Sequence, residues 1–358
     1  MAIDQKTRKL AKIIVDYSIA VKPNENVIIS ASSEANDFIT ALYEEIILKG
    51  ANPILRLGLP GLSSFFFKHA TKKQLTDFPK IFDYTIKNSQ KYIGIDSEYN
   101  TKEFSSVDPQ KLALRNKATR KITNYINNRE DKIGGCSVGY PCAALAQEAE
   151  MSISDYEDFV FNACLQDWQK ISKDLNKLLA KFKKGKKVQL IGKNVDLKFE
   201  INGKQAQIDD GKDNMPGGEI FMAPIRNTME GNILFDYPAI ESGKEVTDIY
   251  LEFKKGKVIK VTASKNENFL KTMLNIDSNA SRVGEFGIGA NPKITRFTKN
   301  LLFDEKIIGT IHLALGMAYA KNGGGNNSSI HWDIVKDMRE AKIILDNKVI
   351  QQKGRWKI

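Results

Sequence analysis

Residues 26–59, NVIISASSEANDFITALYEEIILKGANPILRLGL, decide the fold class of the first half of this chain. The runs that begin at Asn26 and Asn52 are short and apolar, which is typical of buried strands. Between them, residues 34–49 space their apolar side chains as an amphipathic helix does, and Gly50 follows as a C-cap. A strand, a helix and a second strand in this order predict a βαβ unit.

The turn inside this segment argues against nucleotide binding. Residues Ser30 to Ser33 lie where the first βα turn of a nucleotide-binding domain would be, but they contain neither GxGxxG nor GxxxxGK. We therefore interpret the turn as structural.

The sequence pattern changes after residue 188, where short alternating segments separated by turn residues predict a strand-rich domain. A long helix is expected before the change, over residues 155–181, and a hairpin turn after it, at residues 254–256. We therefore predict an α/β protein whose residues 1–185 form an N-terminal βαβ-type domain. Residues 186–358 are predicted to form a C-terminal mixed α+β, strand-rich domain, which the polar residues described below identify as metal-binding.

The charge of the chain is positive but evenly distributed. The 358 residues include 54 Lys and Arg and 43 Asp and Glu, which gives a formal net charge of +11. Such a charge attracts nucleic acids, anionic membranes or acidic substrates. However, the local run of lysines at residues 181–187 is not interleaved with aromatic residues, as a base-stacking surface requires. We therefore expect no specific binding to nucleic acid.

The cysteines and the apolar runs indicate the compartment. Cys136, Cys142 and Cys164 are odd in number and lack CxxC spacing, so neither a disulfide framework nor a cysteine zinc site is expected. The N-terminal residues lack the apolar region of a signal peptide, and no run reaches the ~18 apolar residues of a membrane span. We expect a cytoplasmic protein with reduced thiols and no membrane association.

Two of the three histidines lie in one stretch, IHLALGMAYAKNGGGNNSSIHWD, at residues 311–333. A helix that starts near Thr310 would carry His312 in its first turn and Tyr319 on the same face two turns later. Both side chains would then reach one site. The alternative is that this histidine packs in the core.

Further candidate ligands lie on either side of this predicted helix. After the segment NGGGNNSS, which we expect to be flexible, His331 and Asp333 at positions i and i+2 of an extended segment point to one side. Upstream, Glu219 and Glu285 are flanked by glycines, which let the backbone approach closely. Imidazole and carboxylate together suit zinc, cobalt or manganese, whereas all-oxygen sites suit magnesium or calcium. Alternatively, the histidine caps a loop and the glutamates are solvated turn residues.

Four blocks of sequence carry a resemblance to a known family. They are NMPGGEIFMAP (214–224), RVGEFGIG (282–289), LFDEKIIGTIHLALGMAY (302–319) and NNSSIHWD (326–333). In these blocks, and in their order, the chain resembles the thermophilic metallo-aminopeptidases of the aminopeptidase T and aminopeptidase S type, which use two divalent metal ions. The resemblance covers nearly the whole chain and implies a homodimer that acts on short peptides with a free N-terminus. It implies as metal-site residues Glu219, Glu285, His312, Tyr319, His331 and Asp333.

The resemblance also gives a hypothesis for the chemistry. The carboxylates of Glu219, Glu285 and Asp333, with one bridging hydroxide, balance the charge of two divalent ions. In this hypothesis Glu285 bridges two ions of zinc, cobalt or manganese, with magnesium as a further option. Either Glu219 or Glu285 carries the proton to the leaving amine, and Tyr319 binds an ion or stabilises the oxyanion. Glu305, in the LFDE segment, is a candidate further participant, which we do not match to a ligand position of the family.

Two other functions are open alternatives to the enzyme. One is a catalytically inactive metal-binding scaffold of the same fold, and the other is a basic nucleic-acid-binding protein. Because nucleic-acid binding weakens steeply with salt and is indifferent to chelators, salt and chelation separate the three.

Overall fold

The computed structural model describes residues 3–127 and 134–357 of the chain. The chain folds into two compact units. They comprise residues 1–166 with 211–217, and residues 167–210 with 218–358. The domain boundary after residue 185 stays a prediction from the sequence. Within the described ranges, no helix is long and apolar enough to cross a membrane.

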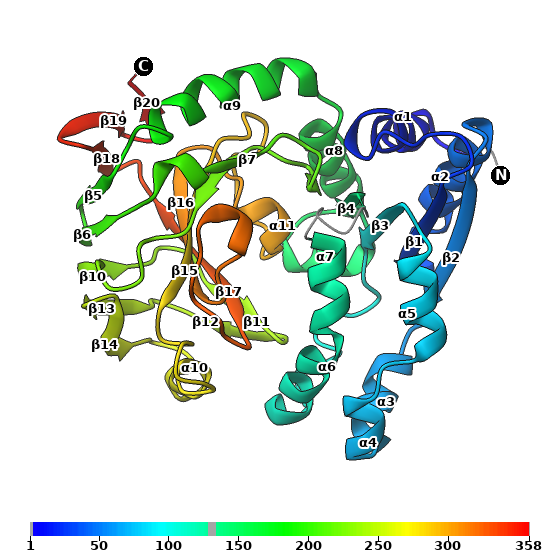
Figure 1. The fold of residues 1–358 in the computed structure, drawn as a ribbon, viewed down its shortest axis with the longest axis horizontal. Helices are drawn as coiled ribbons and strands as arrows, with labels where there is room; N and C mark the ends of the chain where they lie inside the picture. The colour runs from blue at the N-terminus through cyan, green and yellow to red at the C-terminus, as the bar shows by residue number, and fades with distance from the viewer. Residues whose placement is uncertain (1–2, 128–133, 358) are drawn as a thin grey trace. The chain divides into compact units, whose positions relative to one another are not determined.

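The first unit is built on a five-stranded parallel sheet (Figure 1). In spatial order its strands are β2 (Asn52–Gly58), β1 (Asn26–Ser32), β3 (Lys91–Asp96), β4 (Gly134–Gly139) and β8 (Asn214–Met215). β1 and β2 pair in parallel, and α2 (Asn36–Leu48) lies between them in the chain. The predicted βαβ unit is therefore confirmed.

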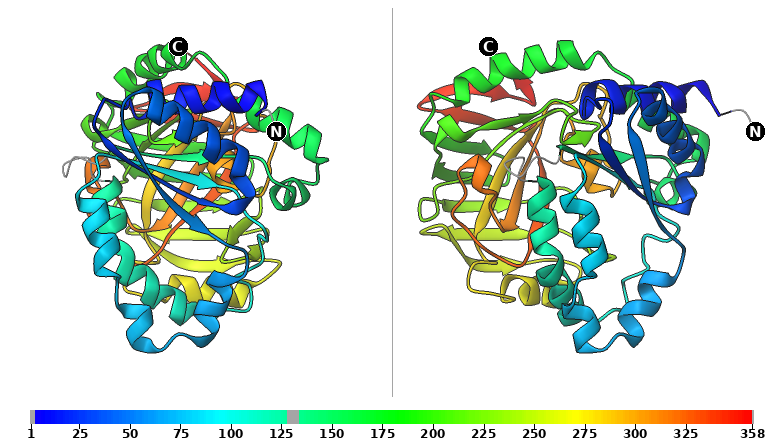
Figure 2. Two further views of the ribbon diagram at one scale, coloured as in Figure 1. Left: turned by 90° about the vertical axis from the view of Figure 1, so that its right-hand side faces the viewer. Right: turned by 45° about the vertical axis from the view of Figure 1, so that its right-hand side comes forward.

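Helices supply most of the remaining residues of the first unit. Besides α2 they are α1 (Gln5–Ile13) with its π-helical continuation (Ile14–Ser18), a 3-10 turn (Ser33–Ala35), α3 (Leu62–His69), α4 (Lys72–Thr76), α5 (Lys80–Lys87), α6 (Pro109–Asn127), α7 (Ala143–Glu148) and α8 (Ile153–Cys164). α1 and α2 lie side by side (Figure 2), and Arg8 Nη1 of α1 is 2.6 Å from Glu44 Oε2 of α2. Leu10 and Phe38 of these helices are fully buried. The three cysteines are buried, and none of them forms a disulfide within the described residues.

The second unit contains two antiparallel sheets and a two-stranded ribbon. The larger sheet has the order β14 (Lys257–Thr262), β13 (Tyr250–Lys254), β10 (Glu230–Leu234), β6 (Val195–Glu200), β5 (Lys187–Gly192), β18 (Ala341–Leu345), β19 (Lys348–Gln352), β20 (Arg355–Trp356). The smaller sheet has the order β17 (His331–Asp337), β16 (Thr310–Gly316), β15 (Val283–Gly289), β9 (Glu219–Met222), β7 (Gln207–Asp209). The ribbon pairs β11 (Ala239–Glu241) with β12 (Lys244–Val246). The strand-rich prediction and the hairpin at residues 254–256 are confirmed.

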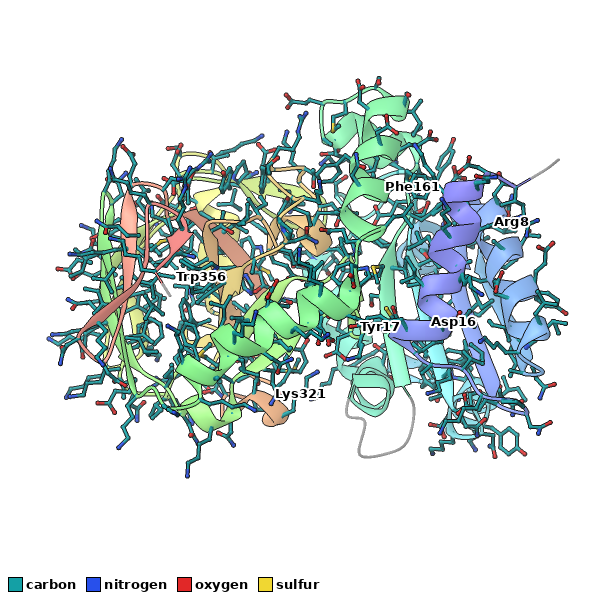
Figure 3. All side chains as sticks on the ribbon, turned by 90° about the horizontal axis from the view of Figure 1, so that it is seen from above. Arg8, Asp16, Tyr17, Phe161, Lys321 and Trp356 are labelled. Carbon is teal, nitrogen blue, oxygen red and sulfur yellow. The ribbon has the colours of Figure 1, made fainter. Side chains whose placement is uncertain are left out.

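Both sheets of the second unit contribute to one apolar core. Phe199 of β6 meets Phe286 of β15 with their ring centroids 5.0 Å apart. Trp356, labelled in Figure 3, packs edge to face against Phe182. The helical segments of this unit are α9 (Trp168–Phe182), α10 (Glu267–Leu274), α11 (Leu301–Asp304) and the 3-10 turns Gly203–Gln205 and Ala320–Asn322. Since each buried large apolar side chain contributes about 1.5–3 kcal/mol, this core fixes the strands that border it.

Two helix predictions are wrong. Residues 310–316 form strand β16 and not the start of a helix. All seven residues are buried, and an apolar run without alternation does not distinguish a buried strand from a helix. The long helix predicted over residues 155–181 is interrupted, because α8 ends at Cys164 and Asp167 caps a new helix by accepting a hydrogen bond from the Lys170 amide.

Candidate metal centre

Four neighbouring strands of the smaller sheet carry polar side chains on one face. Side chains alternate along a strand, so the residues between them point the opposite way. Those that point into the core include Ile220, Phe286, Leu313 and Trp332. Those on the polar face are Glu219 of β9, Glu285 of β15, His312 of β16, and His331 and Asp333 of β17. The sheet therefore brings together five of the six residues that the sequence singled out.

The imidazole of His312 lies among three carboxylates. Its Nε2 atom is 3.4 Å from Glu219 Oε2, 3.7 Å from Glu285 Oε1 and 3.9 Å from Asp333 Oδ1. All four side chains are buried. Each carboxylate comes from a different strand, so no short sequence motif contains the cluster.

Glycines in β15 make room for this arrangement. A Cβ atom added at Gly287 would overlap the imidazole ring of His312, and one added at Gly284 would overlap the backbone of Met317. The ring therefore lies directly over a residue that has no side chain. The glycines on either side of Glu285 are therefore needed for space.

Both histidines of the cluster direct one ring nitrogen to a backbone carbonyl. His312 Nδ1 is 3.1 Å from the Glu305 carbonyl oxygen, and His331 Nδ1 is 2.8 Å from that of Met317. A carbonyl oxygen can only accept, so each Nδ1 donates its hydrogen, and each Nε2 has a lone pair available whenever its ring is neutral. Ligating histidines in metal sites are oriented in the same way. His331 Nε2 lies 3.3 Å from Asp333 Oδ2.

Several polar atoms of the cluster are buried and lack a hydrogen-bond partner. They are Glu219 Oε2, His312 Nε2 and Asp333 Oδ1. Unsatisfied buried polar atoms cost free energy, and here they belong to side chains that face one another. Candidate ligand atoms within 4.8 Å of one another form two groups, Glu219–Glu305–His312 and Glu285–His312–Asp333. Mixed nitrogen and oxygen donors in a buried cluster fit a divalent transition metal.

The pKa values of the cluster describe the same electrostatic environment. Burial lowers the pKa of His312, but the contact with Glu285 and the charge of Glu219 outweigh it and raise that pKa to about 9. Burial likewise opposes protonation of His331, but the charge of Asp333 raises the pKa of His331 to about 10. Burial raises the pKa of Glu219 above its usual range. The surroundings therefore favour a positive charge at the centre of the cluster, whether an imidazolium or a metal cation carries it.

Tyr319 and Asn322 follow β16 and approach the cluster from one side. The Tyr319 ring lies 5.0 Å from that of His331, and burial raises the pKa of the Tyr319 hydroxyl. Asn322 Nδ2 donates to Glu285 Oε2 at 2.8 Å. Tyr319 thus lies near the cluster as predicted, although by way of a turn after a strand and not on a helix.

The segment after Asn322, which we predicted to be flexible, is hydrogen-bonded at several points. Asn326 Nδ2 donates to the carbonyl oxygens of Gly316 and Asn279. The amide and the hydroxyl of Ser329 both donate to Asp277 Oδ2. These bonds hold the middle and the C-terminal end of the segment, which connects Tyr319 to His331.

Sequence reasoning missed Lys306. This lysine is fully buried in the turn between α11 and β16, and its Nζ lies 3.5 Å from Glu219 Oε1 and contacts Glu305. The sequence held one signal, since Lys306 lies within the block that resembles the metallo-aminopeptidases. Fully buried lysines are rare, which makes this one a part of the site and not of the core.

These features define a metalloprotein, with a buried centre of carboxylates and imidazoles on a strand-rich unit. The sequence profile described as thermophilic metalloprotease (M29) matches residues 3–356. The chain therefore belongs to the thermophilic metalloprotease (M29) family, whose members are hydrolases. This confirms the resemblance seen in the sequence.

Individual relatives agree with the family. The chain is 22% identical to aminopeptidase AmpS of Bacillus subtilis, over 94% of this chain and 90% of the relative. It is 22% identical to aminopeptidase 2 of Geobacillus stearothermophilus, over 99% and 98% of the two chains. Aminopeptidase T of Thermus aquaticus is 32% identical over 40% of each chain.

Solved structures share the fold. Wild-type AmpT from Thermus thermophilus superposes with a TM-score of 0.85 at 22% identity, covering 100% of both chains. A 2,5-dihydroxypyridine dioxygenase from Pseudomonas putida has a TM-score of 0.60 at 13% identity, over 100% of this chain and 98% of that one. These likenesses show the fold, and the α/β class with a strand-rich C-terminal part is confirmed.

Proposed function

We propose that this protein is a metal-dependent aminopeptidase that removes N-terminal residues from peptides. The observation that carries the proposal is the set of buried, unpartnered Glu219, His312 and Asp333 atoms that face one another. Membership of a metalloprotease family and likeness to several aminopeptidases support it.

We further propose that the cluster holds two divalent ions, of zinc, cobalt or manganese, with magnesium as another option. His312 belongs to both candidate ligand groups, but its single Nε2 binds one ion. A carboxylate has two oxygens, so Glu285 is the better bridge. Glu219 and His312 then complete one half of the centre, and His331 and Asp333 complete the other.

Ions held by these residues would supply a hydroxide near neutral pH and would polarise the scissile carbonyl. The chain's own residues orient the substrate and move protons. Glu219 or Glu285 transfers a proton from the attacking water to the leaving amine, and the Tyr319 hydroxyl binds an ion or donates to the developing oxyanion. The metal centre would also hold the free α-amine of the substrate, which explains why cleavage occurs at the N-terminus.

The remaining parts of the proposal concern the surroundings of the enzyme. We propose short peptides with a free N-terminus as substrates, a homodimer as the assembly and the cytoplasm as the location. Size-exclusion chromatography with light scattering tests the assembly directly, and a monomer at working concentration would contradict it.

The test of function combines chelation with one substitution. Hydrolysis of an aminoacyl-anilide should stop after chelation, and adding cobalt, zinc or manganese should restore it. Glu285→Gln should abolish activity while the variant stays folded. The matched control is Glu340→Gln, which changes an exposed glutamate paired with Lys193 at 2.9 Å and should keep full activity.

Three outcomes would each contradict part of the proposal. Full activity in Glu285→Gln refutes the site assignment. Metal binding without activity on any peptide would favour the inactive scaffold. Salt-sensitive binding to nucleic acid, unaffected by a chelator, would favour the third function.

A further inference from the structure

A buried cation lies on one side of the carboxylate cluster. Lys306 has no exposed surface, and its Nζ pairs with Glu219 Oε1 at 3.5 Å and with Glu305. A third carboxylate, that of the buried Asp209 of β7, lies directly opposite Glu219 in the β7–β9 pairing. The ammonium thus partly neutralises this group of acidic side chains.

The backbone on either side holds Lys306 in place. Its amide donates to the Phe303 carbonyl at 3.0 Å, and its carbonyl accepts from the Asn291 amide at 3.1 Å. A Cβ atom at Gly289 would overlap the carbonyl of Ile307, so the turn that carries Lys306 packs closely on β15. The ammonium is therefore a fixed feature of the site.

The other half of the cluster is stabilised by different groups. Glu285 Oε2 accepts a hydrogen bond from the neutral amide of Asn322. Asp333 Oδ2 lies 3.3 Å from His331 Nε2. A cation that binds beside Glu219 and Glu305 lies close to the ammonium of Lys306, whereas the group that contacts Glu285 in the other half is the neutral amide of Asn322.

We propose that Lys306 is an internal counter-ion that makes the two halves of the metal centre unequal. The half with Glu219 and Glu305 holds its ion weakly and exchanges it, because the ammonium repels a second cation and already compensates these carboxylates. The half with His331 and Asp333 retains its ion. The inference rests on the proposed metal centre and adds to it an order of binding.

The test measures metal content and affinity, not activity. Metal-free protein titrated with zinc or manganese in a calorimeter should show two classes of site. Dialysis against a limiting chelator should leave one ion per chain by metal analysis. Lys306→Met replaces the ammonium by an uncharged side chain of similar length. It should increase the metal affinity of the weaker class of site by about tenfold. Removing the repulsion between two nearby positive charges is easily large enough to produce this change. Lys306→Arg keeps the charge and should retain both classes.

Glu305→Gln provides a second, independent measurement of the two metal affinities in case Lys306→Met does not fold. This variant should weaken the exchangeable class and leave the retained ion unchanged. One affinity for both ions in the wild type, an unchanged weaker class in Lys306→Met, or loss of the retained ion in Glu305→Gln would each overturn the inference.

The failure of this inference is distinguishable from failure of the proposed function. If the protein is an active aminopeptidase whose two metal sites have equal affinity, only the role of Lys306 is contradicted, and the proposed function stands. A wild-type protein that binds no zinc, cobalt, manganese or magnesium would overturn both.

Discussion

Replacing Gly287 by Ala introduces a methyl group beneath the imidazole of His312. The added Cβ would lie 2.0 Å from Nε2, whereas ordinary contacts begin at 3.4 Å, so the ring must move by about 1.4 Å. Nε2 is 3.4–3.9 Å from the three carboxylates, so such a shift breaks the geometry of the whole cluster. The left-handed backbone region is not involved at this position, so the effect is steric.

The expected loss is large in activity and moderate in stability. Overpacking costs about 1–3 kcal/mol of stability. A misplacement of about 1 Å at a catalytic group costs roughly 100-fold in rate. Anilide hydrolysis, metal analysis and thermal unfolding should therefore show at least this loss of rate, less bound metal and a lower Tm for Gly287→Ala.

A matched control and a double variant complete the test. Gly325→Ala lies in the segment between Tyr319 and His331, has no atom within 4 Å of its added Cβ, and should behave as the wild type. Because the methyl group acts through the imidazole, Gly287→Ala should cost little further metal affinity when His312 is already Ala. Wild-type metal affinity and activity in Gly287→Ala would refute the proposed position of His312.

Two further predictions concern the groups that hold the cluster. Asn322→Ala removes the donor to Glu285 and should lower metal affinity by about 10–100-fold, measured by competition with a chelating dye. Asn268→Ala, exposed on α10, is the control, and equal affinities would contradict the role of the amide. Burial raises the pKa of Asp277, but its bonds to Ser329 outweigh burial and lower that pKa below its usual value. Its contribution to stability should therefore be present above about pH 4 and disappear as the pH falls further. Urea unfolding from pH 3 to 6 should show this loss in the wild type and not in Asp277→Asn.

The sequence predicts those parts of the fold whose pattern is local. The unit from β1 to β2 was predicted because apolar strands flank a helix with a glycine at its end, and each signal lies within a few residues. β16 was predicted as a helix because its residues are buried on both faces. In that strand, Ile311 and Leu313 face the core while His312 faces the carboxylates. Because both faces of the strand are buried, its sequence lacks the alternation of apolar and polar residues that marks a half-exposed strand.

From the sequence, the candidate site could be predicted as a set of residues but not as a three-dimensional arrangement. Glu219, His312 and Asp333 were found by residue type and by resemblance, but the groups that orient them depend on tertiary contacts. Lys306 has the appearance of any surface lysine in the sequence, and its burial follows from the packing of its turn on β15. Asn322 lies in a polar segment whose hydrogen bonds reach Glu285 only in the fold.

The alternation along four strands connects the stability of the second unit to its chemistry. Every strand that carries a candidate ligand also carries core residues on its opposite face, so Phe286 and Trp332 fix the strand positions from which Glu285 and Asp333 project. A core substitution such as Phe286→Leu removes the ring contact with Phe199 and shifts β15 without touching a ligand. Because the side chains of a binding site must be held within about 0.5 Å of the productive geometry, metal affinity should report a small shift of the core more sensitively than Tm does. The rigidity that the proposed two-metal centre requires is therefore supplied by apolar packing on the far side of the sheet.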